Sequence, residues 1–148
     1  MIIMNYESLC KFELSSVDKT GVINELLSLF ELEKNQQKML FDAIELRERL
    51  GTTAMGGGIS LPHTRSILVD GLKIVVGKSE KGISWDDEKI SVVVLFISPV
   101  KPGGPEKHNE FLGHISQNIK EHSSEILVAA SEEELLSLLG LLQLEQGE

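Results

Sequence analysis

The residue whose neighbours best suit it to chemistry is His63. It follows a run of three glycines, Gly56 to Gly58, and comes directly after Pro62. A histidine with a pKa of about 6.5 is mostly neutral at neutral pH, and its free ring nitrogen is then a nucleophile. Glycines let backbone N–H groups approach an anion, and proline stiffens the chain before the ring. His63 is therefore a candidate phosphoryl acceptor, although a mobile glycine loop with a surface or helix-capping histidine explains the same residues.

Two arginines precede this segment at the end of a predicted helix. Arg47 lies sixteen residues before His63. Because a guanidinium can bind two phosphoryl oxygens at once, Arg47 is a candidate for holding the transferred group. A cation in the last turn of a helix is favourable in any case, so a solvated arginine is the alternative. Arg49 fits that alternative better, and we assign it no role.

His108 is the second candidate histidine. At about 100° per residue it shares one helical stripe with four apolar residues, Phe111, Leu112, Ile115 and Ile119. This position is typical of a hydrogen-bonded core histidine. His114 lies off the stripe and is expected to be solvated, while His122 comes near the end of the helix. A zinc site formed by His63, His108 and His122 is conceivable, but the spacings match no compact ligand pattern, and no metal site is predicted.

The hydrophobic pattern predicts short strands alternating with helices. Strands are expected at residues 10–14, 72–78 and 90–98, with a further short strand inside the segment 52–62. The segment 82–88 reads as a loop or hairpin connection, with Trp85 as a half-buried anchor. Alternation of this kind favours an α/β sandwich in one domain, 1–148 with a core of about 10–142. We expect a central mixed β-sheet flanked by helices on both faces.

Capping residues mark the expected helices. Asp18 can cap a helix that carries apolar residues up to Phe30, and Asn35 can cap a second helix that stops at Gly51. A third helix is expected at residues 105–121, after a breaker-rich loop. Ser131 followed by Glu134 forms a capping-box pattern, which starts a last helix that reaches about Leu142.

Composition excludes several classes of protein. The 148 residues include 14 basic and 23 acidic side chains, for a net charge of −9, so a dense basic face for nucleic acid is not expected. Apolar runs are too short for a membrane span, and the first residues are too short a stretch for a signal peptide. A single cysteine, Cys10, rules out a disulfide framework. We therefore expect a cytoplasmic protein without direct membrane insertion.

Three pieces of the chain together resemble the active-site signature of one known family: Arg47-Glu48, Gly51-Thr52-Thr53 and Gly58-Ile59-Ser60-Leu61-Pro62-His63. This is the mannitol/fructose-type enzyme IIA of the bacterial phosphoenolpyruvate-dependent sugar phosphotransferase system (PTS), including its nitrogen-regulatory branch. The resemblance extends from about Cys10 to Leu142. Two residues depart from the pattern. Ser60 stands where the family usually has alanine, and Thr64 stands where a small residue, most often glycine, follows the histidine.

The resemblance implies a phosphocarrier without metal or organic cofactor. His63 would accept a phosphoryl group from the phosphocarrier protein HPr and pass it to an enzyme IIB component in sugar uptake. Arg47 would clamp the group, and His108 would orient His63 or donate to the phosphoryl oxygens. Thr53, Gly58 and Thr64 are the expected phosphate-supporting residues.

Two other functions stay open. One is a regulatory enzyme IIA, whose phosphorylation state controls binding to target proteins. The other is an interaction module that has lost phosphotransfer, because β-branched Thr64 resists positive φ and could crowd the phosphate. Neither the sugar nor the oligomeric state follows from the sequence.

Overall fold

A mixed β-sheet forms the centre of the computed structural model, which describes residues 2–3, 6–101, 104–141 and 145–146. β5 and β6 form an antiparallel hairpin, and β2 lies parallel to β5 on the other side. β3 and β4 follow one another along the free edge of β6, both parallel to it. The strands of this sheet are β2 (Tyr6–Lys11), β3 (Ile59–Ser60), β4 (His63–Ser66), β5 (Leu72–Trp85) and β6 (Glu88–Pro99). A separate parallel pair joins β1 (Ile2–Ile3) to β7 (Glu145–Gln146).

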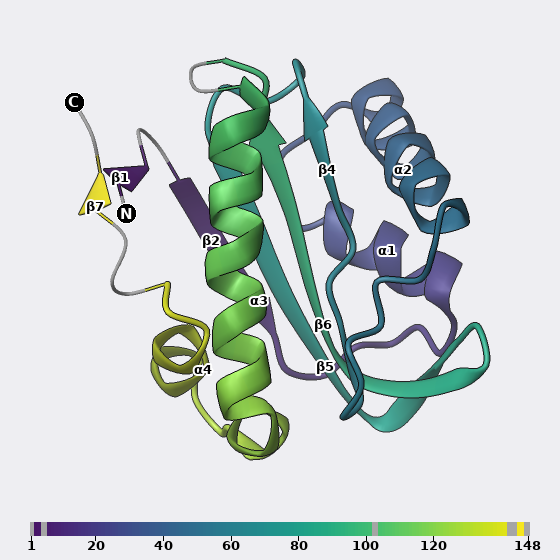
Figure 1. Ribbon diagram of the computed structural model, residues 1–148. Helices are drawn as coiled ribbons and strands as arrows, with labels where there is room; N and C mark the ends of the chain where they lie inside the picture. The colour runs from purple at the N-terminus through teal and green to yellow at the C-terminus, as the bar shows by residue number, and fades with distance from the viewer. Residues whose placement is uncertain (1, 4–5, 102–103, 142–144, 147–148) are drawn as a thin grey trace.

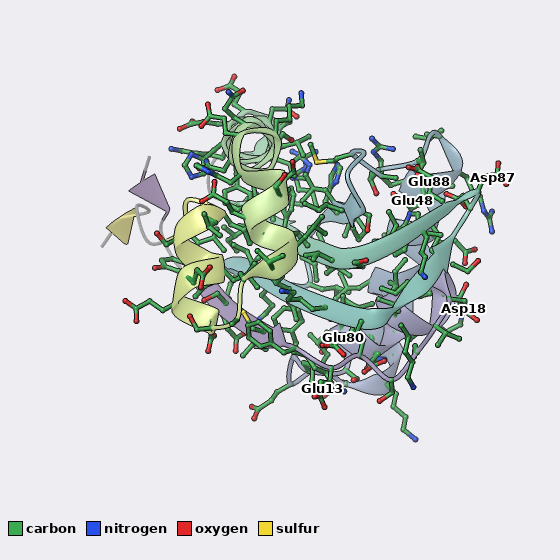
Figure 2. The ribbon with its side chains drawn as sticks, turned by 90° about the horizontal axis from the view of Figure 1, so that it is seen from below. Glu13, Asp18, Glu48, Glu80, Asp87 and Glu88 are labelled. Atoms are coloured by element: carbon green, nitrogen blue, oxygen red, sulfur yellow. The ribbon has the colours of Figure 1, made fainter. Side chains whose placement is uncertain are left out.

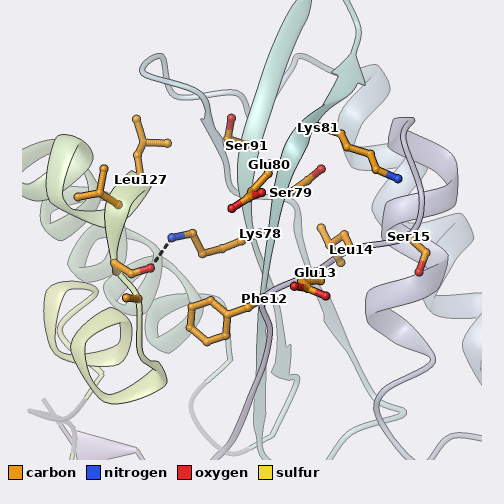
Figure 3. A pocket seen from close by; sticks show the side chains of 13 residues that line it. Phe12, Glu13, Leu14, Ser15, Lys78, Ser79, Glu80, Lys81, Ser91 and Leu127 are labelled. Atoms are coloured by element: carbon orange, nitrogen blue, oxygen red, sulfur yellow. Dashed lines mark hydrogen bonds between the residues drawn. The ribbon is translucent and has the colours of Figure 1, made fainter.

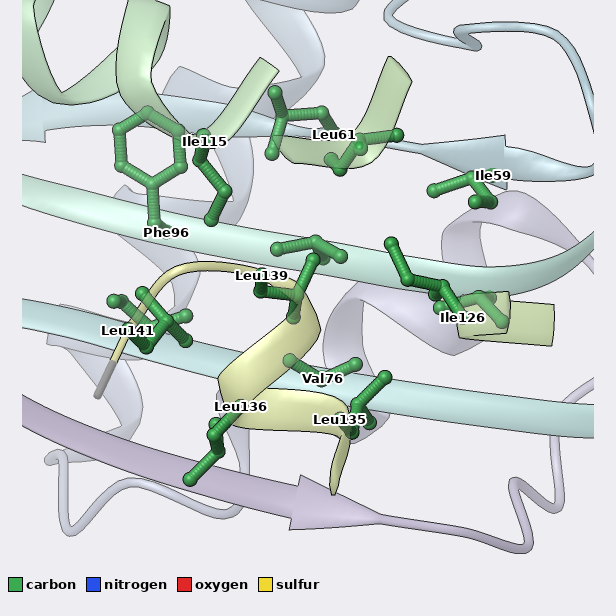
Figure 4. Packing of buried hydrophobic residues seen from close by; sticks show 14 of the residues in the cluster. Ile59, Leu61, Val76, Phe96, Ile115, Ile126, Leu135, Leu136, Leu139 and Leu141 are labelled. Carbon is green, nitrogen blue, oxygen red and sulfur yellow. The ribbon is translucent and has the colours of Figure 1, made fainter. Parts of the chain in front are cut away.

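Helices cover both faces of the sheet, which confirms the expected α/β architecture. α1 (Lys19–Leu27) and α2 (Lys34–Arg49) pack on one face, and α3 (Gly104–Val128) and α4 (Glu132–Leu138) on the other (Figures 1 and 2). Each layer has its own cluster of buried apolar side chains, because alternate residues of β5 and β6 point to opposite faces. In Figure 4 the α3–α4 cluster is seen with Val76, Phe96, Ile115 and Leu135 packed together. None of the helices in the described ranges is long and apolar enough to span a bilayer.

Of the three predicted N-terminal capping residues, Asp18 and Ser131 are confirmed and Asn35 is wrong. The Asp18 side chain accepts from the Gly21 amide at 2.8 Å, and the Ser131 hydroxyl accepts from the Glu134 amide at 3.2 Å. α2 begins at Lys34 rather than after Asn35, because Glu33 and Gln36 form a reciprocal capping box at the start of the helix. Its C-cap is Leu50, so Gly51 follows the helix as expected.

Several strands have other limits than the sequence predicts, because polar residues can extend a strand through backbone hydrogen bonds without an apolar pattern. β5 and β6 continue through the predicted loop and meet at a turn of Asp86 and Asp87, where Asp86 has a φ of 54°. Trp85 therefore lies inside a strand and is fully buried, not half-buried in a loop. The first strand of the sheet is 6–11 instead of 10–14. β4 is not evident from the sequence, because His-Thr-Arg-Ser carries no apolar pattern.

The C-terminal helices also depart from their expected limits. α3 continues to Val128 and bends at His122, whose φ of −123° and ψ of 21° are not helical. α4 ends at Leu138 with Leu139 as its C-cap, whereas the sequence predicts a helix to about Leu142. Residue 142 itself lies outside the described residues.

Candidate functional site

His63 begins β4 and lies beside Phe96 of the central strand β6. Only 5% of the residue is exposed. Its imidazole stacks on the Phe96 ring, with 5.1 Å between ring centroids and 8° between the planes. The mobile-loop interpretation of the sequence is therefore wrong for this residue, since a strand and an aromatic ring hold the imidazole.

A backbone hydrogen bond fixes the tautomer of this imidazole. Nδ1 of His63 lies 2.7 Å from the carbonyl oxygen of Leu61. Because a carbonyl oxygen can only accept, Nδ1 carries the proton and the lone pair is on Nε2. Burial lowers the pKa of His63; the Leu61 carbonyl raises it, the charge of Arg47 lowers it and that of Glu48 raises it, with a net shift downward. The ring is thus a neutral base with its nucleophilic nitrogen at Nε2.

His108 lies directly beside this pair. Its ring centroid is 5.5 Å from those of both His63 and Phe96, and its Nδ1 lies 3.0 Å from Oγ of Ser98. Burial, and then the charges of His63, Arg65 and Arg47, lower the pKa of His108 to about 4. The sequence-based interpretation of a packed, hydrogen-bonded histidine close to His63 agrees with these contacts.

Arg47 and Arg49 have different surroundings, although they are two residues apart. Arg47 is half-buried in the last turn of α2, and its Nη1 donates to the carbonyl of Gly51 at 3.1 Å. That bond uses one of its five N–H donors, and its charge acts on both His63 and His108. Arg49 is exposed and pairs with Glu45 at 2.6 Å, one turn earlier, as expected for a solvated arginine.

Thr53 is buried, and its hydroxyl bonds a carboxylate, not the imidazole of His63. Oγ1 of Thr53 donates to the carboxylate of Glu48, and Nζ of Lys19 lies 2.9 Å from the same carboxylate. Sequence reasoning missed Glu48, although Leu40, Ile44 and Glu48 recur every four residues on the buried face of α2. That spacing was the available signal for a buried carboxylate.

Gly58 is not close to His63. Its carbonyl accepts from the amides of Ser91 and Val92, whereas His63 pairs with Phe96 four residues further along β6, roughly 13 Å away. Gly58 has a φ of 83°, and a side chain there would meet Leu127 near the end of α3. The glycine therefore leads into β3, and its expected role as a direct phosphate support does not fit this position.

Thr64 occupies an ordinary strand conformation. It pairs with Ile97, which packs in the α1–α2 cluster, while His63 pairs with Phe96 in the α3–α4 cluster. Successive strand residues point to opposite faces, so the Thr64 side chain is directed away from the face of His63. Asp86 is the single non-glycine residue with positive φ in the described part of the chain. The expected strain at Thr64, its crowding of a phosphate and its direct hydroxyl contact are all inconsistent with this geometry.

Strand alternation instead brings Arg65 to the face of His63. Arg65 is exposed, and its charge contributes to the lowered pKa of His108. It also lies close to the start of α3, since a Cβ added to Gly104 would be 3.9 Å from Nη1 of Arg65. Sequence reasoning missed this residue because the pattern around it does not predict a strand.

The remaining histidines lie apart from this site. Nε2 of His114 is 2.9 Å from the carbonyl of Gly140, so His114 is half-buried and bonded, not solvated as expected. His122 contacts Glu125 at 3.1 Å. No group of three or more histidine, cysteine or acidic residues in the described ranges is arranged to hold a metal ion.

A cavity of about 860 Å³ lies away from the histidines, between the segment 12–15 that follows β2, strand β5 and the end of α3 (Figure 3). Phe12, Lys78 and Leu127 are among its lining residues, and Nζ of Lys78 donates to the Ala129 carbonyl at 2.5 Å. His63, His108 and Arg47 are not among the residues that line this cavity.

Most of the chain is similar in sequence to proteins of one family. A sequence model of the family described as "Phosphoenolpyruvate-dependent sugar phosphotransferase system, EIIA 2" matches residues 5–140. The PTS fructose-specific EIIABC component of Bacillus subtilis is 26% identical over 135 residues, which are 87% of this chain and 21% of that protein. The PTS fructose-specific EIIA component of Haloferax volcanii is 30% identical over 105 residues, 68% of each chain. The nitrogen regulatory protein of Bradyrhizobium diazoefficiens is 26% identical over 94 residues, 62% of this chain and 60% of that protein.

Solved structures show the same fold. The nitrogen regulatory protein IIA-Ntr of Neisseria meningitidis superposes with a TM-score of 0.72 at 21% identity, over 89% of this chain and 92% of that chain. In a complex of enzyme IIAMTL with phosphorylated enzyme IIBMTL from Escherichia coli, the matched chain has a TM-score of 0.62 at 17% identity, over 88% of this chain and 93% of that chain.

Proposed function

The chain belongs to the EIIA 2 family of the phosphoenolpyruvate-dependent sugar phosphotransferase system, and from this premise we propose that His63 accepts a phosphoryl group from phospho-HPr and passes it to an enzyme IIB component. The chain would act in the cytoplasm as one EIIA domain. The observation that carries the proposal is the 2.7 Å bond from Nδ1 of His63 to the Leu61 carbonyl. This bond leaves Nε2 unprotonated, and a phosphoryl acceptor needs such a lone pair.

The transfer is a displacement at phosphorus. The lone pair of His63 Nε2 forms a new N–P bond, while the bond from phosphorus to the donor's phosphohistidine nitrogen breaks and its electron pair returns to the donor ring. In the second transfer the acceptor nucleophile attacks phosphorus, and the electron pair of the Nε2–P bond returns to His63. The high-energy N–P bond of the donor supplies the driving force, so the proposal requires no metal or organic cofactor.

Arg47 and His108 are proposed to act on the charge of the transferred group. Four N–H donors of Arg47 are free of the Gly51 carbonyl and can bind two phosphoryl oxygens. The Nε2 atom of His108 is free of Ser98 and can donate to a phosphoryl oxygen when it carries the proton. Such donors accelerate transfer when they bind the charge more strongly in the transition state than in the ground state.

The relatives support two uses of this chemistry. Two of them are fructose-specific components, which favours sugar uptake through enzyme IIB, and the Escherichia coli complex of enzyme IIAMTL with phosphorylated enzyme IIBMTL supports the enzyme IIB partner. One relative is a nitrogen regulatory protein, which favours the alternative that phosphorylation of His63 controls binding to target proteins. A sugar-uptake defect on deletion of the gene would favour transport, and normal uptake would favour regulation.

The direct test mixes the protein with phosphoenolpyruvate, enzyme I and HPr and records intact mass. We expect an acid-labile gain of one phosphate, which is absent in His63→Ala and when HPr is omitted. His114→Gln is a matched control, because this imidazole bonds the Gly140 carbonyl away from the site and should not affect labelling. No gain in the wild-type protein would overturn the proposal and favour an interaction module without phosphotransfer.

A further inference from the structure

Glu48 is a buried carboxylate on α2 with partners on two other segments of the chain. Its side chain is 3% exposed and lies 2.9 Å from Nζ of Lys19 at the start of α1. It accepts from Oγ1 of Thr53, and the Thr53 amide lies 3.5 Å from its other oxygen. In Figure 2 Glu48 is seen on the side of the sheet where the β5–β6 hairpin ends. A carboxylate is rarely buried so deeply unless its charge and hydrogen bonds are satisfied, and here both are.

Hydrogen bonds continue from Thr53 to the imidazole. The Thr53 carbonyl accepts from the Leu61 amide at 3.0 Å, and the Leu61 carbonyl accepts from Nδ1 of His63 at 2.7 Å. The next residue, Pro62, has no N–H, and its carbonyl accepts from the Phe96 amide at 3.1 Å. The Leu61 amide is thus bonded to the Thr53 carbonyl, and the Thr53 hydroxyl is in turn bonded to Glu48.

We propose that Glu48 is a positioning residue for phosphoryl transfer: through Thr53 and Leu61 it selects the tautomer of His63 that leaves Nε2 free. This inference rests on the proposed function of His63 as phosphoryl acceptor. Glu48 does not touch the transferred group. It holds Thr53, Thr53 holds the Leu61 amide, and the Leu61 carbonyl then lies where only the Nδ1–H tautomer can bond to it.

Lys19 makes this arrangement compatible with an incoming phosphate. A carboxylate near His63 repels a phosphoryl group, and the charge of Glu48 does act on the imidazole. The Lys19 ammonium at 2.9 Å offsets that charge. Glu48 can therefore serve as a hydrogen-bond acceptor for Thr53 without placing an unpaired negative charge beside the site.

Substitutions can separate this role from general stability. Glu48→Ala and Thr53→Val each break the first link, whereas Thr53→Ser keeps the hydroxyl and Glu48→Gln keeps an oxygen acceptor. Glu45→Gln is the matched control, because Glu45 lies on the same helix and bonds only the exposed Arg49. Ile44→Val is a second control, since it loosens the core beside Glu48 without touching the hydrogen-bonded chain.

The tautomer of His63 is read from the ¹⁵N chemical shifts of its ring nitrogens in each protein. We expect Nδ1–H in the wild-type protein, both controls and Thr53→Ser, with a population of Nε2–H appearing in Glu48→Ala and Thr53→Val. The rate of phosphorylation by phospho-HPr should fall on the order of tenfold or more in the same two variants, with partial recovery in Glu48→Gln.

The two readouts keep this inference distinct from the proposed function. An unchanged His63 tautomer in both Glu48→Ala and Thr53→Val would overturn the positioning role, even if His63 is phosphorylated normally in the wild-type protein. Absence of phosphorylation in the wild-type protein would overturn the proposed function, while the ¹⁵N spectra would still decide whether Glu48 sets the tautomer. If Glu48→Ala does not fold, Thr53→Val carries the same test.

Discussion

Two neighbouring arginines test the proposed site at the scale of single residues. Arg47 acts on both site histidines, whereas Arg49 is bound to Glu45 in solvent. We expect Arg47→Gln to lower the rate of phosphorylation of His63 on the order of a hundredfold, because a donor to the developing charge is lost. Arg49→Gln should leave the rate unchanged. Initial rates with phospho-HPr measure both, and equal losses in the two variants would contradict the assignment of Arg47.

Ser60 gives a prediction about stability. Its hydroxyl is fully buried and has no hydrogen-bond partner in the described part of the chain. Because an unsatisfied buried hydroxyl is unfavourable, Ser60→Ala should raise the free energy of unfolding by about 1 kcal/mol. Ser79→Ala is the matched control: this buried hydroxyl accepts from the Gly82 amide, so its loss should lower stability. Urea denaturation measures both, and a less stable Ser60→Ala protein would disprove the argument.

The lowered pKa values of the site histidines predict how stability depends on pH. Burial holds the pKa of His108 at about 4 and that of His63 below its usual value, whereas both titrate near about 6.5 in an unfolded chain. Between these limits the unfolded chain binds more protons, so the free energy of unfolding should fall as pH falls from about 6.5 towards 4. Above about pH 6.5 the two histidines make their full contribution to the free energy of unfolding. Urea midpoints across the window measure this loss.

His108→Gln should reduce the slope of that pH dependence, because one of the two buried bases is removed. His122→Gln is the control, since this side chain is 36% exposed and contacts Glu125 on the surface. If His108→Gln retained the full slope, the lowered pKa of His108 would not be its source.

At the scale of elements, Gly77 sets how closely α1 packs on β5. A Cβ at this position would lie 2.8–2.9 Å from terminal carbons of Leu14 and Leu26. Gly77→Ala should therefore lower the free energy of unfolding by about 1–3 kcal/mol through overpacking. Gly113→Ala is the opposite case, because this exposed helical glycine has no atom within 4 Å of a new Cβ and should gain about 0.5–1 kcal/mol. Thermal unfolding of the two proteins measures this contrast, and a Gly77→Ala protein as stable as Gly113→Ala would refute it.

Helix starts marked by a capping side chain can be predicted from the sequence, whereas strands that form only by pairing with another strand cannot. Asp18 and Ser131 cap their helices as expected, because a side-chain cap is a local property. β4 could not be predicted, since its polar residues become a strand only by pairing with β6. The Asp86–Asp87 turn escapes prediction for a related reason: Asp86 must adopt a positive φ that no glycine signals.

The candidate site shows the same division. Residue type, helical stripe and family resemblance identify His63, Arg47 and His108, and the two histidine rings do meet. The sequence also predicts Gly58 and Thr64 beside the phosphate, but Gly58 lies further along β6, and strand alternation directs the Thr64 side chain to the other face.

At the scale of the whole molecule, Lys19 links parts of the chain that are distant in sequence. Its Nζ lies 2.9 Å from Glu48 on α2, 2.9 Å from Asp86 at the hairpin turn, and 5.2 Å from the centre of the Trp85 ring. The first helix, the segment leading to the site and the tip of the hairpin therefore meet at one ammonium group. Lys19 therefore supports both the buried carboxylate of Glu48 and the turn of the hairpin.

Removing this ammonium should destabilise the whole fold. Lys19→Met leaves the buried carboxylate of Glu48 without its cation, so we expect the free energy of unfolding to fall by about 3 kcal/mol. Lys38→Met breaks the exposed pair with Asp42 and should change it by less than about 0.5 kcal/mol. Adding Glu48→Gln to Lys19→Met should restore part of the loss, because no unpaired charge then stays buried. Urea denaturation of the wild type, Lys19→Met, Glu48→Gln, the double variant and Lys38→Met measures these differences. Strictly additive losses in the double variant would show that Lys19 and Glu48 do not act as a pair.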